Sequence, residues 1–106
     1  GRPVNGKKAR WAVRMSGGRF LSVSDGEILD AQKRLAACEG VFAEPASCAG
    51  IAGLYRLASQ NGLSTGKEYV AVLTGNGLKD TDAATSGKRP PVEVDAELKA
   101  IREVLL

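Results

Sequence analysis

Residues 73–80 hold the side chains best suited to binding a small molecule. The segment follows an apolar run at 69–73 and reads Leu73-Thr74-Gly75-Asn76-Gly77-Leu78-Lys79-Asp80. In open α/β sheets, ligands bind beyond the carboxyl ends of the strands, and glycines let the backbone approach a ligand closely. The Thr74 hydroxyl and the two glycines after it therefore indicate a ligand pocket, with an ordinary turn as the alternative. The pair Gly75-x-Gly77 lacks the third glycine of the dinucleotide fingerprint.

A second candidate stands just before an apolar segment at 46–58 and reads Glu44-Pro45-Ala46-Ser47. The dipole of a helix favours an anionic carboxylate near its N-terminus. Glu44 is therefore either a ligand-facing group or a capping carboxylate. Lys79 and Asp80, which follow the glycine turn, are expected to form a solvated pair.

Other kinds of chemistry are limited by what the sequence lacks. The chain has no histidine, the commonest general base, and only two cysteines, where a zinc site needs about four ligands. We therefore expect no metal site. Cys38 and Cys48 lie in alanine-rich surroundings and are predicted to be small core residues. The glycines of 62–67 are one residue too close for a phosphate-binding P-loop, and Gly87-Lys88 is followed by Arg89 where a P-loop has Ser or Thr.

Length and composition indicate one globular domain. The chain has 106 residues, 43% of them hydrophobic and 25% charged, which excludes disorder as the main state. No apolar run approaches 18 residues, so we expect no membrane partner. The net charge is +3, and a basic cluster near the start could contact phosphates. A solvated helix face is the usual explanation of such a cluster, so we expect no nucleic-acid partner. The cluster consists of Arg2, Lys7, Lys8, Arg10 and Arg14.

Hydrophobic periodicity predicts the elements that position these groups. Helices are predicted over 7–16, 24–38, 46–58 and 94–106, and strands over 19–24 and 69–73, with a brief strand at 41–43. Ser24 and Glu27 have the spacing of a capping box, and residues 79–95 are expected to form a surface loop. The alternation predicts an α/β fold with three layers, in which a partial parallel sheet is flanked by helices. Two clearly predicted strands are too few to cover the faces of these helices. The chain therefore looks like part of a protein with a larger sheet.

Several motifs, in this order along the chain, resemble the C-terminal part of the threonine synthase family. They are Gly1-x-Pro3-Val4-Asn5, 16–21, 24–29, 44–47, 52–54 and above all the string 73–80. That family consists of pyridoxal-phosphate (PLP) enzymes of the tryptophan-synthase-β fold type. The segment 44–47 also occurs in related dehydratases, whereas Thr74-Gly75-Asn76-Gly77-Leu78-Lys79-Asp80 is much more specific.

The resemblance implies a site and a reaction. It makes Thr74, Gly75 and Glu44 the cofactor-binding residues, with the Thr74 hydroxyl meeting the pyridine nitrogen. The implied reaction converts O-phospho-L-homoserine and water to L-threonine and phosphate. None of the seven lysines matches the family's Schiff-base lysine motif, which we expect upstream of Gly1. No catalytic residue is therefore assigned, and the isolated chain is expected to be inactive.

The resemblance also implies an organisation. Residues 1–85 would be the end of the catalytic domain, and 86–106 a polar tail with a closing helix. The partners would be the substrate, the remainder of the same enzyme and a second copy in a cytoplasmic homodimer. A related PLP dehydratase or β-replacement enzyme, or a free-standing module that binds a phosphorylated metabolite, stays open as an alternative.

Overall fold

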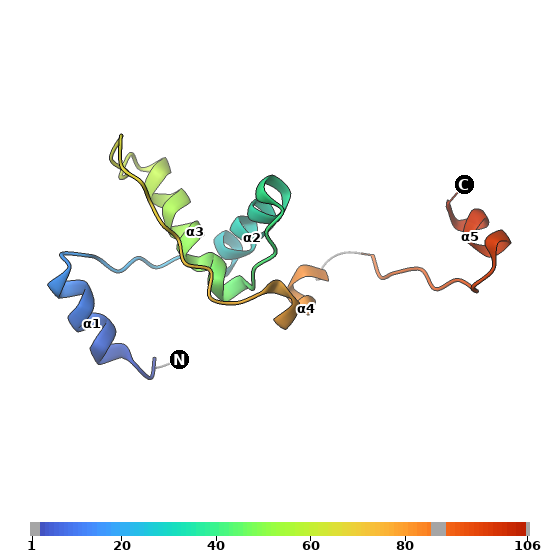
Figure 1. Ribbon diagram of the computed structural model, residues 1–106, viewed down its shortest axis with the longest axis horizontal. Coiled ribbons are helices and arrows are strands. Elements are labelled where there is room, and N and C mark those ends of the chain that lie inside the picture. Colours follow the sequence, from blue (N-terminus) through green and yellow to red (C-terminus); the bar gives the residue numbers. More distant parts are fainter. Residues whose placement is uncertain (1–2, 86–88, 106) are drawn as a thin grey trace.

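The computed structural model describes residues 3–85 and 89–105 of the chain. Gly1, Arg2, Gly87, Lys88 and Leu106, which the sequence analysis names, lie outside these residues. Two long helices form the centre, and shorter helices lie on either side of them along the chain (Figure 1). The elements are α1 (Gly6–Met15), α2 (Asp25–Glu39), α3 (Pro45–Ser59), the 3₁₀ helix η1 (Gly77–Lys79), α4 (Thr81–Thr85) and α5 (Leu98–Leu105).

Local signals fix the start and the end of α2 and the start of α3. The predicted capping box is confirmed: the Glu27 backbone N–H donates to Ser24 Oγ, and the Ser24 backbone N–H donates to the Glu27 carboxylate. Helix α2 ends at Gly40, whose φ of 66° lies in the left-handed region that glycine adopts easily. Pro45 occupies the first turn of α3, where its missing N–H costs no helical hydrogen bond.

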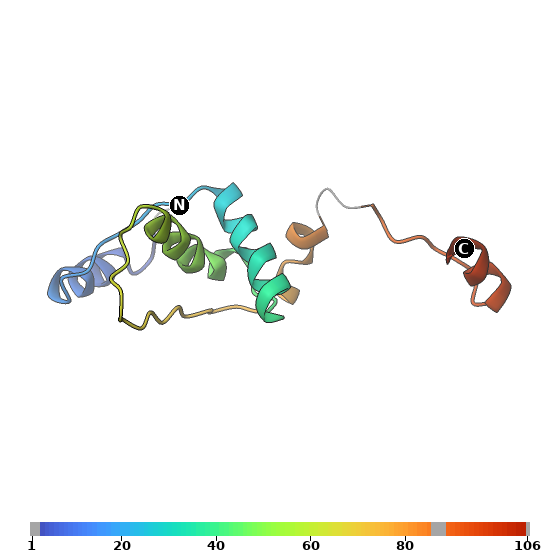
Figure 2. The ribbon, with the colours of Figure 1, turned by 90° about the horizontal axis from the view of Figure 1, so that it is seen from above.

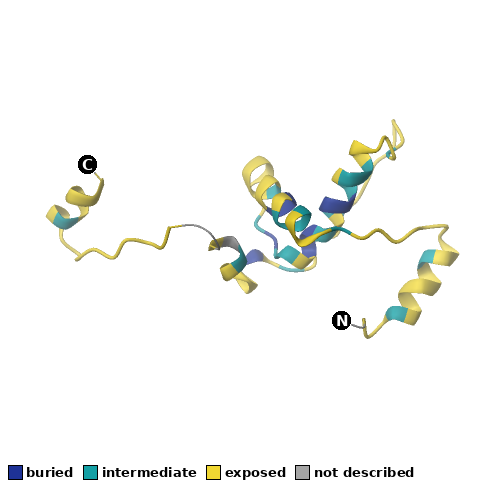
Figure 3. Ribbon diagram, turned by 180° about the vertical axis from the view of Figure 1, so that it is seen from behind, coloured by how far each residue is buried: buried dark blue, intermediate teal, exposed yellow. Residues whose placement is uncertain are grey.

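The core lies between α2 and α3 and consists of small side chains. Figure 3 shows that the buried positions gather on these two helices and on the segments next to them. Small side chains let the two helices approach closely, and larger, half-buried side chains pack around them. The core residues are Ala31, Ala43, Cys48 and Ala52, with Val23, Ile28, Leu35, Ile51 and Leu73 packed against them.

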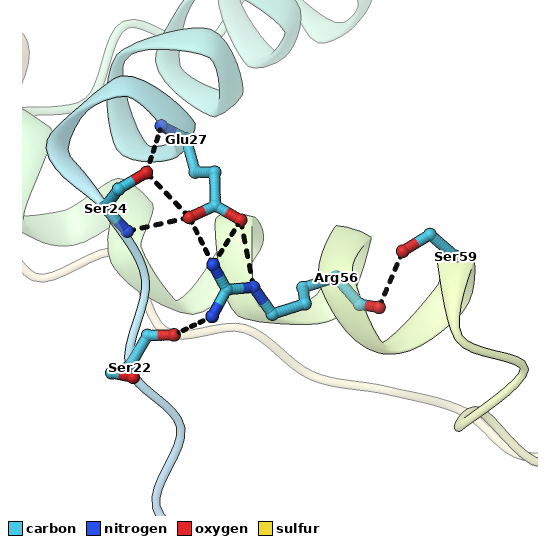
Figure 4. Close-up of polar contacts among 5 residues, drawn as sticks. All are labelled: Ser22, Ser24, Glu27, Arg56 and Ser59. Atoms are coloured by element: carbon cyan, nitrogen blue, oxygen red, sulfur yellow. Dashed lines mark hydrogen bonds and ion pairs between the residues drawn. The ribbon is translucent and has the colours of Figure 1, made fainter.

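A polar network joins the start of α2 to the second half of α3 (Figure 4). Arg56 Nε donates to Glu27 Oε1 at 2.9 Å, its Nη2 donates to both Glu27 oxygens, and its Nη1 donates to the backbone carbonyl of Ser22. The hydrogen bond from the Ser24 backbone N–H, followed by the Arg56 guanidinium, lowers the pKa of Glu27 from its ordinary 4.5 to about 2. The network therefore ties the segment that leads into α2 to helix α3.

Among the described residues, the segments predicted as strands do not pair into a sheet, and of them only 41–43 contributes a bridge residue. Within the described ranges, the one β-bridge is antiparallel and joins Ala43 to Asn76. Residues 19–24 and 69–73 have no hydrogen-bonded ladder, because a strand needs a neighbour and no described segment supplies one. Val70 and Val72 are 89% and 75% exposed. The three-layer arrangement with a partial parallel sheet stays a prediction.

The chain is open around its small core. Its radius of gyration is 19.2 Å, compared with about 13 Å for a compact domain of this length. Seen from above, α1 and α5 lie on opposite sides of the α2–α3 pair (Figure 2). Neither α1 nor α5 has a buried residue. Much apolar surface is therefore left in contact with water.

The C-terminal region differs from the prediction in two ways. The predicted loop 79–95 contains the short helix α4, which begins where Asp80 Oδ1 accepts a hydrogen bond from the Ala83 N–H. The closing helix, predicted over 94–106, begins only at Leu98. In the part of the chain that the structure describes, every helix is too short or too polar to cross a membrane.

Candidate functional site

Two segments far apart in the sequence, 42–47 and 74–77, meet at the start of α3. The Glu44 N–H donates to the Gly75 carbonyl at 3.1 Å, and the Gly77 N–H donates to the Phe42 carbonyl at 3.0 Å. These two backbone hydrogen bonds flank the Ala43–Asn76 bridge. The structure therefore brings together the two motifs that the sequence analysis selected separately.

A cluster of two hydroxyls, a carboxylate and a backbone N–H forms at this junction. Ser47, in the first turn of α3, accepts a hydrogen bond from the Gly75 N–H at 2.7 Å. Its Oγ lies 3.1 Å from Thr74 Oγ1 and 3.3 Å from Glu44 Oε1. Ser47 is buried, Glu44 is half-buried and Thr74 is exposed. We call these four residues the hydroxyl cluster: Glu44, Ser47, Thr74 and Gly75.

Both glycines of the turn are required by close neighbours. A Cβ at Gly75 would lie 2.0 Å from Glu44 Oε1, and a Cβ at Gly77 would lie 2.5 Å from the ring of Phe42. Gly75 therefore makes room for the carboxylate, and Gly77 makes room for the aromatic ring. Between them, Asn76 Oδ1 accepts a hydrogen bond from the Leu78 N–H at 2.9 Å and caps η1.

The carboxylate of Glu44 does not cap α3. Glu44 occupies the N-cap position, but its side chain makes no capping hydrogen bond with the first turn. Its Oε1 instead lies 3.3 Å from Ser47 Oγ. The capping interpretation of Glu44 is therefore wrong, because the carboxylate lies over the Gly75 backbone.

Gln32 supports the cluster, and the sequence analysis missed it. Its Nε2 donates to the Ala43 carbonyl at 2.7 Å, and its side chain is buried. This bond holds the backbone just before Glu44. A signal was available, because Gln32 stands four residues after Ile28 and so lies on the helix face that packs against the core.

The remaining candidates lie outside the cluster. Lys79 and Asp80 are both exposed, and Asp80 caps α4 instead of pairing with Lys79.

Cys48 is a core residue as predicted, and burial raises the pKa of its thiol. Cys38 is exposed, so its prediction as a core residue is wrong. It lies in the last turn of α2.

Comparison with known proteins decides the family. Residues 1–75 match the family described as "Pyridoxal-phosphate dependent enzyme". The chain belongs to this family. Similar proteins named threonine synthase occur in Methanocaldococcus jannaschii and Methanosarcina acetivorans, 41% and 45% identical over 99% of this chain. Another, from Synechocystis, is 47% identical over 92% of the chain. The chain spans about a quarter of the length of these relatives, 26–27% in each case.

The hydroxyl cluster fits the cofactor that gives this family its name. An unprotonated pyridine nitrogen is a hydrogen-bond acceptor and needs a donor. Thr74 has a hydroxyl that can donate, and it is the exposed one of the two hydroxyl residues. The other, Ser47, is buried behind it. The donor set is therefore suited to a neutral ring nitrogen.

Proposed function

We propose that this chain is part of a PLP enzyme that converts O-phospho-L-homoserine and water to L-threonine and phosphate. The observation that carries the proposal is the identity of 41–47% to proteins named threonine synthase along nearly the whole chain. The string 74–80 supports it, because its first residues lie in the hydroxyl cluster. Its last four residues, Gly77-Leu78-Lys79-Asp80, favour threonine synthase over related dehydratases.

The proposed roles follow from the donors and acceptors at the site. Bound PLP supplies an electron sink for the carbon atoms of the substrate. Thr74 would donate its hydroxyl proton in a hydrogen bond to the ring nitrogen. A hydroxyl is too weak an acid to protonate that nitrogen, whereas a carboxylic acid could. Thr74 would therefore keep the ring neutral and make it a weaker electron sink.

Glu44 and Gly75 would form the wall next to Thr74. The Gly75 N–H is already bonded to Ser47, so the contribution of Gly75 would be space and not a free donor. The Glu44 carboxylate lies against this backbone and would contribute a negatively charged group to the same wall. These assignments give each predicted cofactor-binding residue a distinct task.

The test is an assay of the full-length protein that contains this chain. With PLP and O-phospho-L-homoserine, we expect phosphate and L-threonine to form in equal amounts. Formation of a 2-oxo acid and ammonia from L-serine or L-threonine, without phosphate release from the phosphorylated substrate, would favour the dehydratase alternative. Binding of the substrate without turnover would favour the free-standing module. The chain alone is expected to release no phosphate, because none of its lysines lies in the family's lysine motif.

The same proposal covers the partners and the location of the protein. The exposed apolar residues of the segment 69–73 are suited to contact with the remainder of the catalytic domain, since relatives are about four times as long as this chain. A homodimer in the cytoplasm is proposed from the resemblance to threonine synthases.

A further inference from the structure

Ser47 is the centre of the hydroxyl cluster and has no role in the function proposed above. It is 5% exposed. Three groups surround its Oγ: the Gly75 N–H at 2.7 Å, Thr74 Oγ1 at 3.1 Å and Glu44 Oε1 at 3.3 Å. A serine in the first turn of a helix usually bonds only to its own helix or to water. Two of these three partners lie on the far segment of the chain.

Counting protons leaves two arrangements of the cluster. A hydroxyl has one proton to donate and two lone pairs, and one lone pair of Ser47 accepts from the Gly75 N–H. If Ser47 donates to Glu44, Thr74 can donate back to Ser47, which leaves the outer side of Thr74 with lone pairs only. If Ser47 donates to Thr74, the Thr74 proton cannot point back and must point outward. The direction of the Ser47 proton therefore decides whether Thr74 offers a donor or an acceptor.

The distances favour donation to Thr74. A hydrogen bond from a hydroxyl to a carboxylate is normally about 2.5–2.7 Å long, and the 3.3 Å between Ser47 and Glu44 is far beyond that. The contact with Thr74 is shorter. Donation from the Gly75 N–H at 2.7 Å polarises the Ser47 hydroxyl and strengthens its own donation.

We propose that Ser47 is a positioning residue that donates its proton to Thr74 and thereby directs the Thr74 proton to the pyridine nitrogen of the cofactor. The inference rests on the proposed function, because it assumes PLP next to Thr74. The sequence of donors is Gly75 N–H to Ser47, Ser47 to Thr74, and Thr74 to the ring nitrogen. No bond other than hydrogen bonds forms or breaks.

The test measures PLP affinity and the cofactor absorption spectrum in the full-length protein. Ser47→Ala and Thr74→Val are made singly and together. Ser47→Cys serves as a variant of nearly the same size whose thiol is only a weak donor. Ser47→Thr retains the hydroxyl. Ser59→Ala is the matched control, because Ser59 is an exposed serine on α3 that bonds only to the Arg56 carbonyl.

Ser47→Ala and Ser47→Cys should each weaken PLP binding about fivefold, the effect of one net hydrogen bond of about 1 kcal/mol, and should shift the cofactor spectrum. Ser47→Thr should restore most of the affinity, and Ser59→Ala should change nothing. In the Thr74→Val background, Ser47→Ala should cause no further loss, because Ser47 acts through Thr74.

Two results would overturn the inference in different ways. Equal losses from Ser47→Ala with and without the Thr74 hydroxyl would show that Ser47 only supports the fold, and would leave the proposed function intact. A full-length protein that bound no PLP would overturn the proposed function itself, and the task of Ser47 with it.

Discussion

Replacing Gly75 by alanine should test the contact between the backbone and the Glu44 carboxylate. The new Cβ would lie 2.0 Å from Oε1, 2.1 Å from Cδ and 2.6 Å from Oε2 of Glu44. Ordinary contact begins at 3.4 Å, so the carboxylate must withdraw by about 1.4 Å. The backbone itself is no obstacle, because the described glycines with positive φ are Gly17, Gly40 and Gly66.

The cost of this withdrawal follows from what the carboxylate leaves behind. It gives up its 3.3 Å contact with Ser47 Oγ, and even a full net hydrogen bond there would contribute only about 0.5–1.5 kcal/mol. Overpacking costs about 1–3 kcal/mol where neighbours cannot move, but a carboxylate is the mobile end of a flexible side chain. We therefore expect Gly75→Ala to lower the free energy of unfolding by about 1 kcal/mol and to weaken PLP binding.

The assay is urea unfolding of the full-length apoprotein, compared among four proteins. They are the wild type, Gly75→Ala, Glu44→Ala and the double variant. The double variant should be no less stable than Glu44→Ala alone, because truncating Glu44 removes the clash. Gly50→Ala is the control, since a Cβ added there would meet no atom within 4 Å apart from its own stretch of helix, and alanine in a helix should stabilise by about 0.5–1 kcal/mol. Equal destabilisation by Gly75→Ala with and without the carboxylate would refute this explanation of the glycine.

Three further predictions concern other parts of the chain. The pKa of Glu27 is lowered from 4.5 to about 2. Its interactions should therefore stabilise the folded chain above pH 4.5 and lose this effect as the pH falls toward 2. Glu27→Gln should flatten the pH dependence of the urea midpoint between these two pH values. Val72→Asp should destabilise the full-length protein by roughly 2 kcal/mol or more but leave the isolated chain unchanged, since Val72 is 75% exposed there; equal urea midpoints for wild type and variant at full length would contradict it. Thr74→Asp should favour a protonated ring nitrogen, seen as a changed cofactor spectrum and a changed ratio of L-threonine to abortive elimination products; an unaltered spectrum would argue against contact with the ring.

The two central helices could be predicted because their signals are local. The Ser24–Glu27 capping box, Gly40 and Pro45 each act within a few residues of the chain. The short helix α4 is not predictable from periodicity, because its signal is a single residue, Asp80, whose side chain accepts from the Ala83 N–H. Cys38 is exposed although its surroundings are alanine-rich, because composition alone does not say which positions of a helix are buried.

The site could be predicted only in part. Thr74 and Glu44 were selected by their positions next to apolar segments, yet nothing local says that they share a partner. Ser47 joins them through a contact across 27 residues, which no periodicity encodes. The extended segment 69–73 could not be assigned to a sheet from this chain, since strand pairing depends on neighbours that the described residues do not supply.

The most direct test of the central claim is a crystal structure of the full-length protein with PLP bound. The deciding quantity is the distance between Thr74 Oγ1 and the pyridine nitrogen. We expect a hydrogen bond of no more than about 3.2 Å, with the Ser47 hydroxyl still in contact with Thr74. A carboxylate at the ring nitrogen, or a cofactor bound away from the hydroxyl cluster, would contradict the account.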